Sequence, residues 1–360
     1  MILRIVTFTA QGEALAHRMI EEWREVIPQY RRKEIPLEQW TGECFAKHLP
    51  ILFVGACGIA VRAISPFVKD KLSDSAVVVM DEKGKYVIPL LSGHMGGANE
   101  LAIQIAKKIC ATPVLTTATD VEGLFSVDVF AKNNGLRVMN REGIREVAGK
   151  LLRGETVTIT WDDQVRCELK KEGQEELKQI EQEPVAETVT KLLPKGIRFV
   201  PFETKDVDIR IGTKKSLGQM EEKTQKLLLL AKEYLLGIGC KKDKSFSELD
   251  GFLKEHVAWK LEEEIHAIAS IDLKAREEGL WELAQYYHLP FMTYSAEELA
   301  SVEGEFSESE FVREMTGVAN VCERAAMYAA GEGGELIQKK EASNGMTVAV
   351  SRRVPVIRFR

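Results

Sequence analysis

The segment with the densest potential chemistry is residues 89–101, Pro-Leu-Leu-Ser-Gly-His-Met-Gly-Gly-Ala-Asn-Glu-Leu. An apolar run ends here, three glycines surround a histidine, and a helical pattern begins at once, which predicts a strand-to-helix turn. Glycines let a ligand approach the backbone closely, and the unpaired N–H groups of a helix N-terminus attract anions such as carboxylates and phosphates. The candidate binding residues of this turn are Ser92, Gly93, Gly96, Gly97 and Asn99.

Two titratable side chains give the same turn catalytic potential. His94 is suited to act as a general acid or base near neutral pH, and Glu100 is placed to orient His94 or a water molecule. The alternative is a tight turn with a capped helix and a surface histidine. The glycine spacing matches neither GxGxxG nor a Walker A loop, so a nucleotide site is not favoured.

Two further segments in the first half of the chain carry groups suited to anions. Gly55 and Gly58 follow an apolar run and precede a helical pattern in which Arg62 can reach an anionic ligand. The alternative is a packed turn with a surface arginine. Residues 69–74 are expected to form a solvated loop whose lysines, Lys71 among them, add to an anion pocket.

Hydroxyl and carboxylate side chains follow the predicted strand at 113–116. Open α/β sheets bind ligands at the carboxyl ends of their strands, which makes Thr117 and Thr119 candidate binding residues. Asp120 is either a general base or only the N-cap of the next helix, and the sequence leaves both interpretations open.

A second anion-prone turn is predicted in the C-terminal part of the chain, where residues 237–242 read Gly-Ile-Gly-Cys-Lys-Lys. Its candidate binding residues are Gly239, Lys241 and Lys242. Cys240 is not expected to be a nucleophile, because no paired histidine is evident. The histidines lack metal-ligand spacing, so no metal site is predicted.

The order of the predicted elements indicates an α/β fold. Apolar runs alternate with helical patterns, which predicts an α/β layered sheet in an N-terminal domain of residues 1–134. Residues 81–84 are predicted to join the third and fourth runs as a hairpin-like turn. The runs are 2–8, 51–56, 76–80, 86–91 and 113–116.

A small α+β middle domain is expected over residues 135–225. The runs 157–161 and 165–169 predict a hairpin, and the highly charged stretch 170–183 predicts a solvated helix or a loop.

A second α/β domain is expected over residues 226–360. The run 227–231 leads to a buried strand at 235–240, and residues 354–359 are expected to close the domain with β structure. Capping boxes, in which a serine and a glutamate satisfy each other's backbone N–H groups, are predicted to start at Ser245, Ser295 and Ser307.

Composition excludes several classes of protein. The 360 residues are 45% hydrophobic and 29% charged, as in folded globular domains, and the net charge of −6 argues against a general nucleic-acid binder. Six cysteines occur without a CxxC pair, so neither a zinc ribbon nor a dithiol motif is predicted. No signal peptide and no apolar run of about 18 residues is evident. The expected protein is cytoplasmic and reduced, with no membrane partner.

Several of these strings, in order along the chain, resemble one family. They resemble the cobalt-precorrin-5A hydrolases (CbiG-type) of anaerobic cobalamin (vitamin B12) biosynthesis. Where that family commonly has Gly-Cys-Arg-Arg or Gly-Cys-Arg-Lys, this chain has Gly-Cys-Lys-Lys, which keeps the charge but loses bidentate guanidinium geometry. The strings are 58–66, 69–71, 76–81, 89–102, 116–120, 237–242 and 316–326.

The resemblance implies a hydrolase that acts on an anionic cobalt tetrapyrrole. It would open a δ-lactone and release the former C20 carbon with its methyl group as acetaldehyde, leaving cobalt-precorrin-5B. The cobalt would arrive with the substrate, so no cofactor is expected. His94 or Asp120 would activate water, Glu100 would support His94, and backbone N–H groups near Gly96 and Gly97 would hold the oxyanion or a substrate carboxylate.

A rival hypothesis is a non-catalytic protein of the same pathway that binds a corrinoid intermediate and presents it to neighbouring enzymes. A homodimer, or contact with neighbouring pathway enzymes, is a further expectation for either hypothesis. Release of acetaldehyde by the purified protein distinguishes the two.

Overall fold

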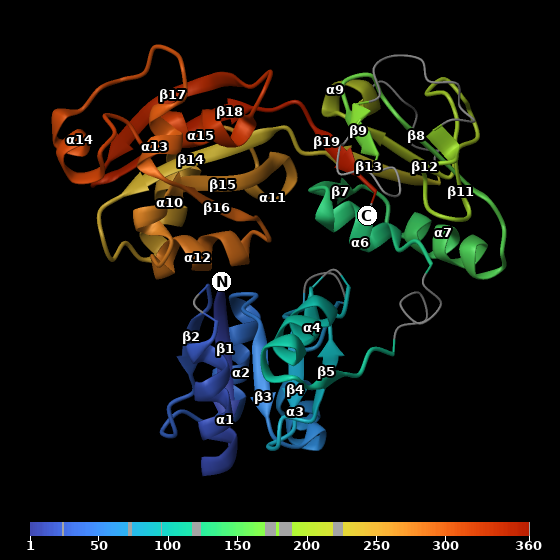
Figure 1. Ribbon diagram of the computed structural model, residues 1–360, viewed down its shortest axis with the longest axis vertical. Coiled ribbons are helices and arrows are strands. Elements are labelled where there is room, and N and C mark those ends of the chain that lie inside the picture. The colour runs from blue at the N-terminus through green and yellow to red at the C-terminus, as the bar shows by residue number, and fades with distance from the viewer. Residues whose placement is uncertain are drawn as a thin grey trace. The chain divides into compact units, whose positions relative to one another are not determined.

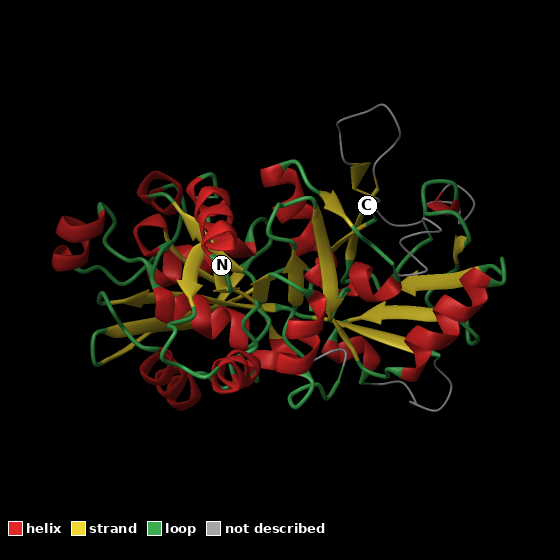
Figure 2. Cartoon of the chain, turned by 90° about the horizontal axis from the view of Figure 1, so that it is seen from below, coloured by secondary structure: helices red, strands yellow, loops and turns green. Residues whose placement is uncertain are grey.

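The chain folds into parallel and mixed β-sheets accompanied by helices, which confirms the predicted α/β class (Figures 1 and 2). The computed structural model describes residues 1–23, 25–70, 74–94, 96–116, 124–169, 178–179, 189–218 and 226–359. Two compact units divide the chain. Unit 1 comprises Met1–Thr117, Cys240–Glu255 and Leu273–Phe291, and unit 2 comprises Ala118–Gly239, His256–Asp272 and Met292–Arg360.

Unit 1 contains a six-stranded sheet, the N-terminal sheet, in the order β2-β1-β3-β4-β5-β6. Its strands are β1 (Ile2–Thr7), β2 (Ile27–Tyr30), β3 (Ile51–Val54), β4 (Val77–Met80), β5 (Tyr86–Leu91) and β6 (Thr112–Pro113). The predicted hairpin is confirmed, because β4 and β5 are antiparallel, whereas all other neighbours are parallel.

Helices cover both faces of the N-terminal sheet. Because side chains alternate along a strand, Leu52 and Val54 of β3 pack with the first and fourth helices, whereas Ile51 and Phe53 pack with the second and third. The helices are α1 (Ala10–Glu21), α2 (Leu37–Ala46), α3 (Cys57–Ile64) and α4 (Ala98–Ile109).

Two of these elements, β2 and α2, were not anticipated from the sequence. Pro28 interrupts the short run that forms β2. Proline is tolerated there because β2 is an edge strand, where one N–H faces no partner strand.

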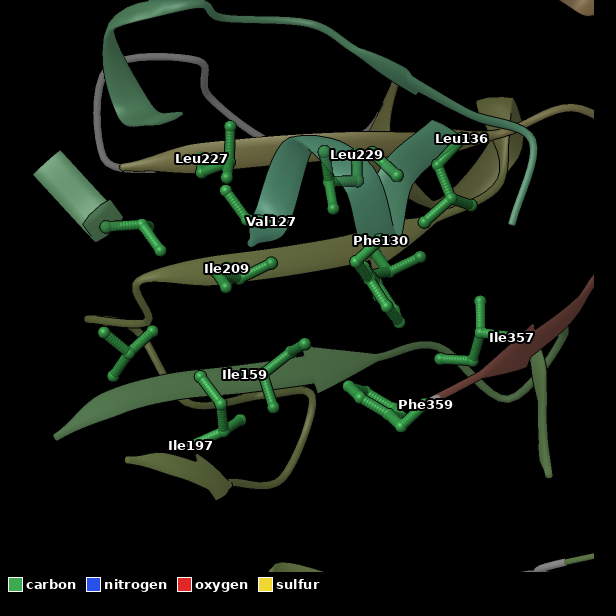
Figure 3. Packing of buried hydrophobic residues seen from close by; sticks show 14 of the residues in the cluster. Val127, Phe130, Leu136, Ile159, Ile197, Ile209, Leu227, Leu229, Ile357 and Phe359 are labelled. Atoms are coloured by element: carbon green, nitrogen blue, oxygen red, sulfur yellow. The ribbon is translucent and has the colours of Figure 1, made fainter. Parts of the chain in front are cut away.

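Unit 2 contains a five-stranded sheet, the middle sheet, in the order β11-β8-β12-β13-β7. Its strands are β7 (Leu136–Val138), β8 (Val157–Trp161), β11 (Ile197–Phe199), β12 (Ile209–Gly212) and β13 (Leu227–Ala231), with helices α6 (Val127–Asn133), α7 (Glu142–Leu152) and α9 (Lys214–Leu217). Its core joins Phe130, Ile159 and Leu229 to Ile357 and Phe359 from the end of the chain (Figure 3).

The hairpin expected at 157–161 and 165–169 is wrong. β8 pairs in parallel with β11 and β12, whereas β9 (Arg166–Leu169) joins a three-stranded sheet with β10 (Lys178–Gln179) and β19 (Val356–Arg358). Buried Asp162 explains the break, because its carboxylate accepts the N–H groups of Gln164 (2.9 Å) and Thr213 (3.0 Å). The intervening turn is thereby fixed to the end of β12.

A second five-stranded sheet of the chain, the C-terminal sheet, has the order β16-β15-β14-β18-β17. Its strands are β14 (Tyr234–Cys240), β15 (Ile265–Ile271), β16 (Phe291–Tyr294), β17 (Glu335–Ser343) and β18 (Met346–Arg352). Residues 354–359 do not close this sheet as expected, because β19 pairs with β9. The run 227–231, which was expected in the C-terminal domain, forms β13 and belongs to the middle sheet, because it pairs with β12 and β7.

The helices of this part of the chain are α10 (Phe246–His256), α11 (Leu261–Glu264), α12 (Glu278–Tyr286), α13 (Ala296–Ala300), α14 (Glu310–Thr316) and α15 (Cys322–Ala330), with a 3₁₀ turn at Asp272–Lys274. No helix in the described part of the chain combines the length and the apolar character that crossing a membrane requires.

Two of the three predicted capping boxes are confirmed. Ser245 and Ser295 each exchange hydrogen bonds with the glutamate three residues later. The third is wrong, because Ser309 rather than Ser307 caps α14. Ser307 instead donates its N–H and its hydroxyl to the buried carboxylate of Glu323, at 2.9 and 3.1 Å.

Candidate functional site

The turn that joins β5 to α4, residues 92–97, lies at one of the two edges of the N-terminal sheet where strands begin and end. Leu91 at the end of β5 pairs with Val77 at the start of β4, so this edge is where β3 and β4 begin. β6 runs parallel to β5, and the chain therefore leaves β6 toward the same edge. Antiparallel β5 thus brings the 92–97 turn and the exit of β6 to one edge.

Gly55, Gly58 and Arg62 lie at the opposite edge from His94, and their role in binding an anion stays a prediction. Gly55 follows the end of β3, and its N–H donates to the carbonyl of Met80 at the end of β4 (2.8 Å). The length of β4 separates the two edges, about 13 Å at about 3.3 Å per residue. Arg62 is exposed on α3.

The 92–97 turn uses its own carbonyl groups to cap α4. The N–H groups of Gly97, Ala98 and Asn99 donate to the carbonyls of His94 (3.1 Å), Ser92 (3.1 Å) and Gly93 (2.9 Å). The expectation of bare N–H groups is therefore wrong at these three positions. The physical reason is that the turn is long enough to fold back over the helix end.

Close packing within the turn explains two of its glycines. A Cβ at Gly96 would lie 2.3 Å from the Cβ of Ser92 and 2.7 Å from its carbonyl oxygen. A Cβ at Gly93 would lie 2.6 Å from Oδ1 of Asn99. Gly97 adopts the left-handed conformation, with φ 88°. These glycines shape the turn itself, and a ligand is not needed to account for them.

Ser92 is the feature of the turn that calls for a ligand. Its backbone is left-handed, with φ 57°, and the side chain is buried. Its Oγ has no hydrogen-bond partner among the described residues. Because a buried polar atom without a partner is costly, this hydroxyl is a candidate contact for a bound molecule or water. Ser92 was a candidate binding residue from the sequence, but its left-handed backbone was not predicted.

The two titratable side chains of the turn lie on different parts of it. His94 is partly buried within the turn. Glu100 is exposed on α4, where its Oε1 accepts a hydrogen bond from Nε2 of Gln104 at 2.9 Å. The support of His94 by Glu100 stays a prediction. Lys71, Thr117, Thr119 and Asp120 lie outside the described residues.

The loop that precedes β4 is held by Asp74. This carboxylate is buried, and it accepts the N–H groups of Lys69 (2.9 and 3.1 Å) and Asp70 (3.1 Å). The expectation of a solvated loop is wrong at Asp74, because the side chain turns inward to satisfy backbone donors.

The glycines of the second predicted anion site serve packing. A Cβ at Gly237 would lie 1.8 Å from the carbonyl oxygen of Cys322 in α15, and one at Gly239 would lie 2.6 Å from Oγ1 of Thr347. Both glycines lie within β14, and the Thr347 hydroxyl donates to the Gly239 carbonyl (3.3 Å). Gly239 is therefore covered by the protein itself. Lys241 and Lys242 are exposed, and their binding role stays a prediction.

The Asn320–Glu323 string forms a buried structural cluster in unit 2. The Glu323 carboxylate accepts hydrogen bonds from Ser307, from Nδ2 of Asn320 (2.8 Å) and from the N–H of Lys340 (2.7 Å). Asn320 Oδ1 in turn accepts the Glu323 N–H at 2.9 Å. The cluster joins α15 to β17 and to the segment before α14.

Replacing Glu323 with glutamine is expected to lower the free energy of unfolding by about 2–3 kcal/mol, because an amide NH₂ would face buried donors. Denaturant unfolding measures the change. Glu335→Gln is the matched control, since Glu335 is exposed and pairs with Arg352 at 2.9 Å, and it is expected to cost less than about 0.5 kcal/mol. Equal effects of the two substitutions would contradict a structural role for the cluster.

Within the described ranges, no three His, Cys, Asp or Glu side chains are grouped closely enough to hold a metal ion.

Three stretches of the chain match families of cobalamin biosynthesis. Residues 39–120 match Cobalamin synthesis G N-terminal, residues 125–193 match Cobalamin biosynthesis central region, and residues 234–351 match Cobalamin synthesis G C-terminus.

Curated relatives are similar over most of the chain. A protein of Salmonella typhimurium named cobalt-precorrin-5A hydrolase is 33% identical over 86% of this chain and 83% of its own length. A protein of the same name from Priestia megaterium is 31% identical, over 85% and 79%. The crystal structure of a cobalamin biosynthesis protein G homolog from Sulfolobus solfataricus is 26% identical, covers 98% of this chain and 96% of its own, and has a TM-score of 0.40. The chain belongs to the cobalamin synthesis G (CbiG) family.

Proposed function

We propose that this protein is a cobalt-precorrin-5A hydrolase. The observation that carries the proposal is the similarity, over most of both chains, to two curated proteins of that name. The proposed enzyme works in the cytoplasm. Its cobalt is part of the substrate, and the protein supplies no metal of its own.

The proposed reaction is hydrolysis of the δ-lactone followed by cleavage of a carbon–carbon bond. Water adds to the lactone acyl carbon, which becomes a carboxylate and leaves a hydroxyl group on C20. Loss of the hydroxyl proton forms the carbonyl of acetaldehyde as the bond from C20 to the ring breaks, and its electron pair passes into the conjugated ring. The products are acetaldehyde and cobalt-precorrin-5B.

The 92–97 turn is the proposed catalytic centre. In this proposal His94 or Asp120 removes a proton from the attacking water. The buried Ser92 hydroxyl, which has no partner among the described residues, donates to the oxyanion in place of the occupied Gly97 N–H.

Acetaldehyde release tests the function. The purified protein is incubated without oxygen with cobalt-precorrin-5A, and acetaldehyde is trapped and quantified. One acetaldehyde per substrate consumed is expected, with a rate proportional to the protein concentration. Tight binding of the substrate without acetaldehyde would contradict the proposal and favour a non-catalytic corrinoid-binding protein. Oligomeric state and contacts with neighbouring pathway enzymes stay predictions.

A further inference from the structure

Two connecting segments of unit 2 leave the C-terminal sheet, one toward the middle sheet and the other toward the three-stranded sheet of β9, β10 and β19. One joins β13 to β14 through Lys232 and Glu233, and the other joins β18 to β19 through Arg353. They lie side by side, because the Arg353 N–H donates to the carbonyl of Glu233 at 2.8 Å. This contact brings Lys232 and Arg353 into one neighbourhood.

His266 on β15 completes a group of three basic side chains, the basic cluster Lys232–His266–Arg353. Burial, and then the charges of Arg353 and Lys232, lower the pKa of His266 to about 3. Burial lowers the pKa of Lys232 to about 8, with Arg137 as a second cause. Burial likewise lowers the pKa of Arg353 to about 10, with Arg358 as a second cause. Each of the three groups is therefore poorly solvated, and the charges of both Lys232 and Arg353 reach His266.

No carboxylate of the described residues forms an ion pair with the two cations of the basic cluster. Neither Lys232 nor Arg353 makes an ion pair in the part of the chain that the structure describes. The acid that acts on Lys232 is the exposed Glu262. Glu233, although adjacent to Lys232, interacts electrostatically with Arg352. Within the described residues, Lys232 and Arg353 are therefore without a direct ion-pair partner.

The surrounding basic residues are neutralised, unlike the cluster itself. Arg137 pairs with Glu263 at 2.8 Å, and Arg358 pairs with Glu168 at 2.6 Å. In the Arg353 guanidinium, Nε donates a long hydrogen bond, 3.5 Å, to the carbonyl of Val354. Partly buried cations without a partner are costly to a fold, which indicates that an anion balances them when the protein works.

The position of the His266 ring is fixed. Its Nδ1 is buried, has no hydrogen-bond partner among the described residues, and lies against Gly135. A Cβ at Gly135 would lie 2.2 Å from Nδ1, and the left-handed φ of 62° also favours glycine. The ring is neutral at pH 7, and a backbone hydrogen bond with Gly135 raises its pKa only in part against burial and the two nearby cations. The cluster therefore combines two cations with a neutral imidazole, and its two cations are suited to a carboxylate.

We propose that Lys232, His266 and Arg353 form a binding site for a carboxylate of the ligand, an acetate or propionate side chain of the cobalt tetrapyrrole. The identity of that ligand rests on the proposed function. Arg353 supplies a guanidinium suited to bidentate contact, and Lys232 supplies a point charge. A free small dicarboxylate offers the same chemistry, so the test separates the two sources.

The test compares Lys232→Met and Arg353→Met with Arg352→Met. Arg352 is the matched control, because it is the neighbouring arginine, is half exposed, and pairs with Glu335 on the surface. Binding is measured by titration with cobyrinic acid, a cobalt corrin with free acetate and propionate groups, with its heptamethyl ester, and with succinate. Steady-state acetaldehyde release is measured in parallel.

Each cluster substitution is expected to weaken binding of cobyrinic acid about tenfold and to raise KM similarly, with kcat within about threefold. The ester is expected to bind weakly and equally to all variants, and succinate is expected to compete only at far higher concentration. Without ligand, the unfolding temperature of Lys232→Met is expected to stay level or rise, because an unpaired cation is removed. If Lys232 had a purely structural role, its replacement would lower the unfolding temperature.

Unchanged affinity and KM in both cluster variants would overturn the carboxylate site, while acetaldehyde release by the unsubstituted protein would leave the proposed function standing. Conversely, binding of cobyrinic acid that depends on Lys232 and Arg353, in a protein that releases no acetaldehyde, would support the site and refute the function. Competition by succinate as strong as that of the corrin would overturn the tetrapyrrole as the ligand.

Discussion

Replacing His94 with alanine is expected to lower kcat for acetaldehyde release by about 10²–10⁴-fold, the usual contribution of a positioned general acid or base. The side chain is partly buried in a turn whose backbone is held by its own hydrogen bonds. Loss of the imidazole should therefore leave the fold intact. The readouts are single-turnover rates and the unfolding temperature.

His17→Ala is the matched control. His17 lies exposed on α1, stacked on Tyr30 with ring centroids 4.6 Å apart, and its loss is expected to leave kcat unchanged. Asp120→Asn is measured beside it, because His94 and Asp120 are the two candidates for the base. Near-native turnover in both His94→Ala and Asp120→Asn would remove both from the mechanism.

Replacing Gly96 with alanine is expected to lower kcat by about 10²-fold, although the added methyl group carries no chemistry. The new Cβ would lie 2.3 Å from the Cβ of Ser92 and 2.7 Å from the Ser92 carbonyl, which accepts the Ala98 N–H. The turn has to shift to relieve this contact. A displacement of about 1 Å in a catalytic group is enough for an effect of this size.

The control for Gly96→Ala is Gly251→Ala in α10. A Cβ at Gly251 meets no atom within 4 Å, so this change is expected to keep kcat and to stabilise the helix by about 0.5–1 kcal/mol. Native turnover in Gly96→Ala would show that the geometry of the turn is unimportant to the reaction.

The local layout of the N-terminal sheet could be predicted because its signals are short-range. Alternating apolar runs and helical patterns located β1, β3, β4 and β5, and the polar turn at 81–84 indicated the β4–β5 hairpin. The same hairpin determines where Gly55 and His94 lie, and this placement was not predicted. An antiparallel β5 places its end opposite the end of β3, so Gly55 and His94 had to lie at different edges.

Long-range pairing could not be predicted in the same way. β9 pairs with β19, across almost two hundred residues, and no local pattern records that choice. Asp162 illustrates the difficulty, because beside another aspartate it is typical of a hairpin turn. In the structure its carboxylate is instead buried against backbone N–H groups, among them that of Thr213, which follows β12 and caps α9.

The strand-to-helix turn at 92–97 was predicted from the sequence, but the contacts within it were not. Gly93 and Gly96 suggested an anion-binding turn with exposed N–H groups, but they pack against Asn99 and Ser92. The buried Ser92 hydroxyl, which has no hydrogen-bond partner among the described residues, lies on a left-handed backbone. A serine in the sequence does not predict that backbone conformation. The basic cluster likewise depends on two connecting segments that are distant in the chain and adjacent in space.

Hydrolysis in water enriched in oxygen-18 tests the central claim most directly. If this chain adds water to the lactone acyl carbon, one oxygen-18 atom appears in a carboxylate of the tetrapyrrole product for each acetaldehyde released, as read by mass spectrometry. The His94→Ala protein should incorporate the label at the reduced rate of its acetaldehyde release. Acetaldehyde formed without label in the tetrapyrrole carboxylates would contradict attack at that carbon, and with it the role assigned to the 92–97 turn.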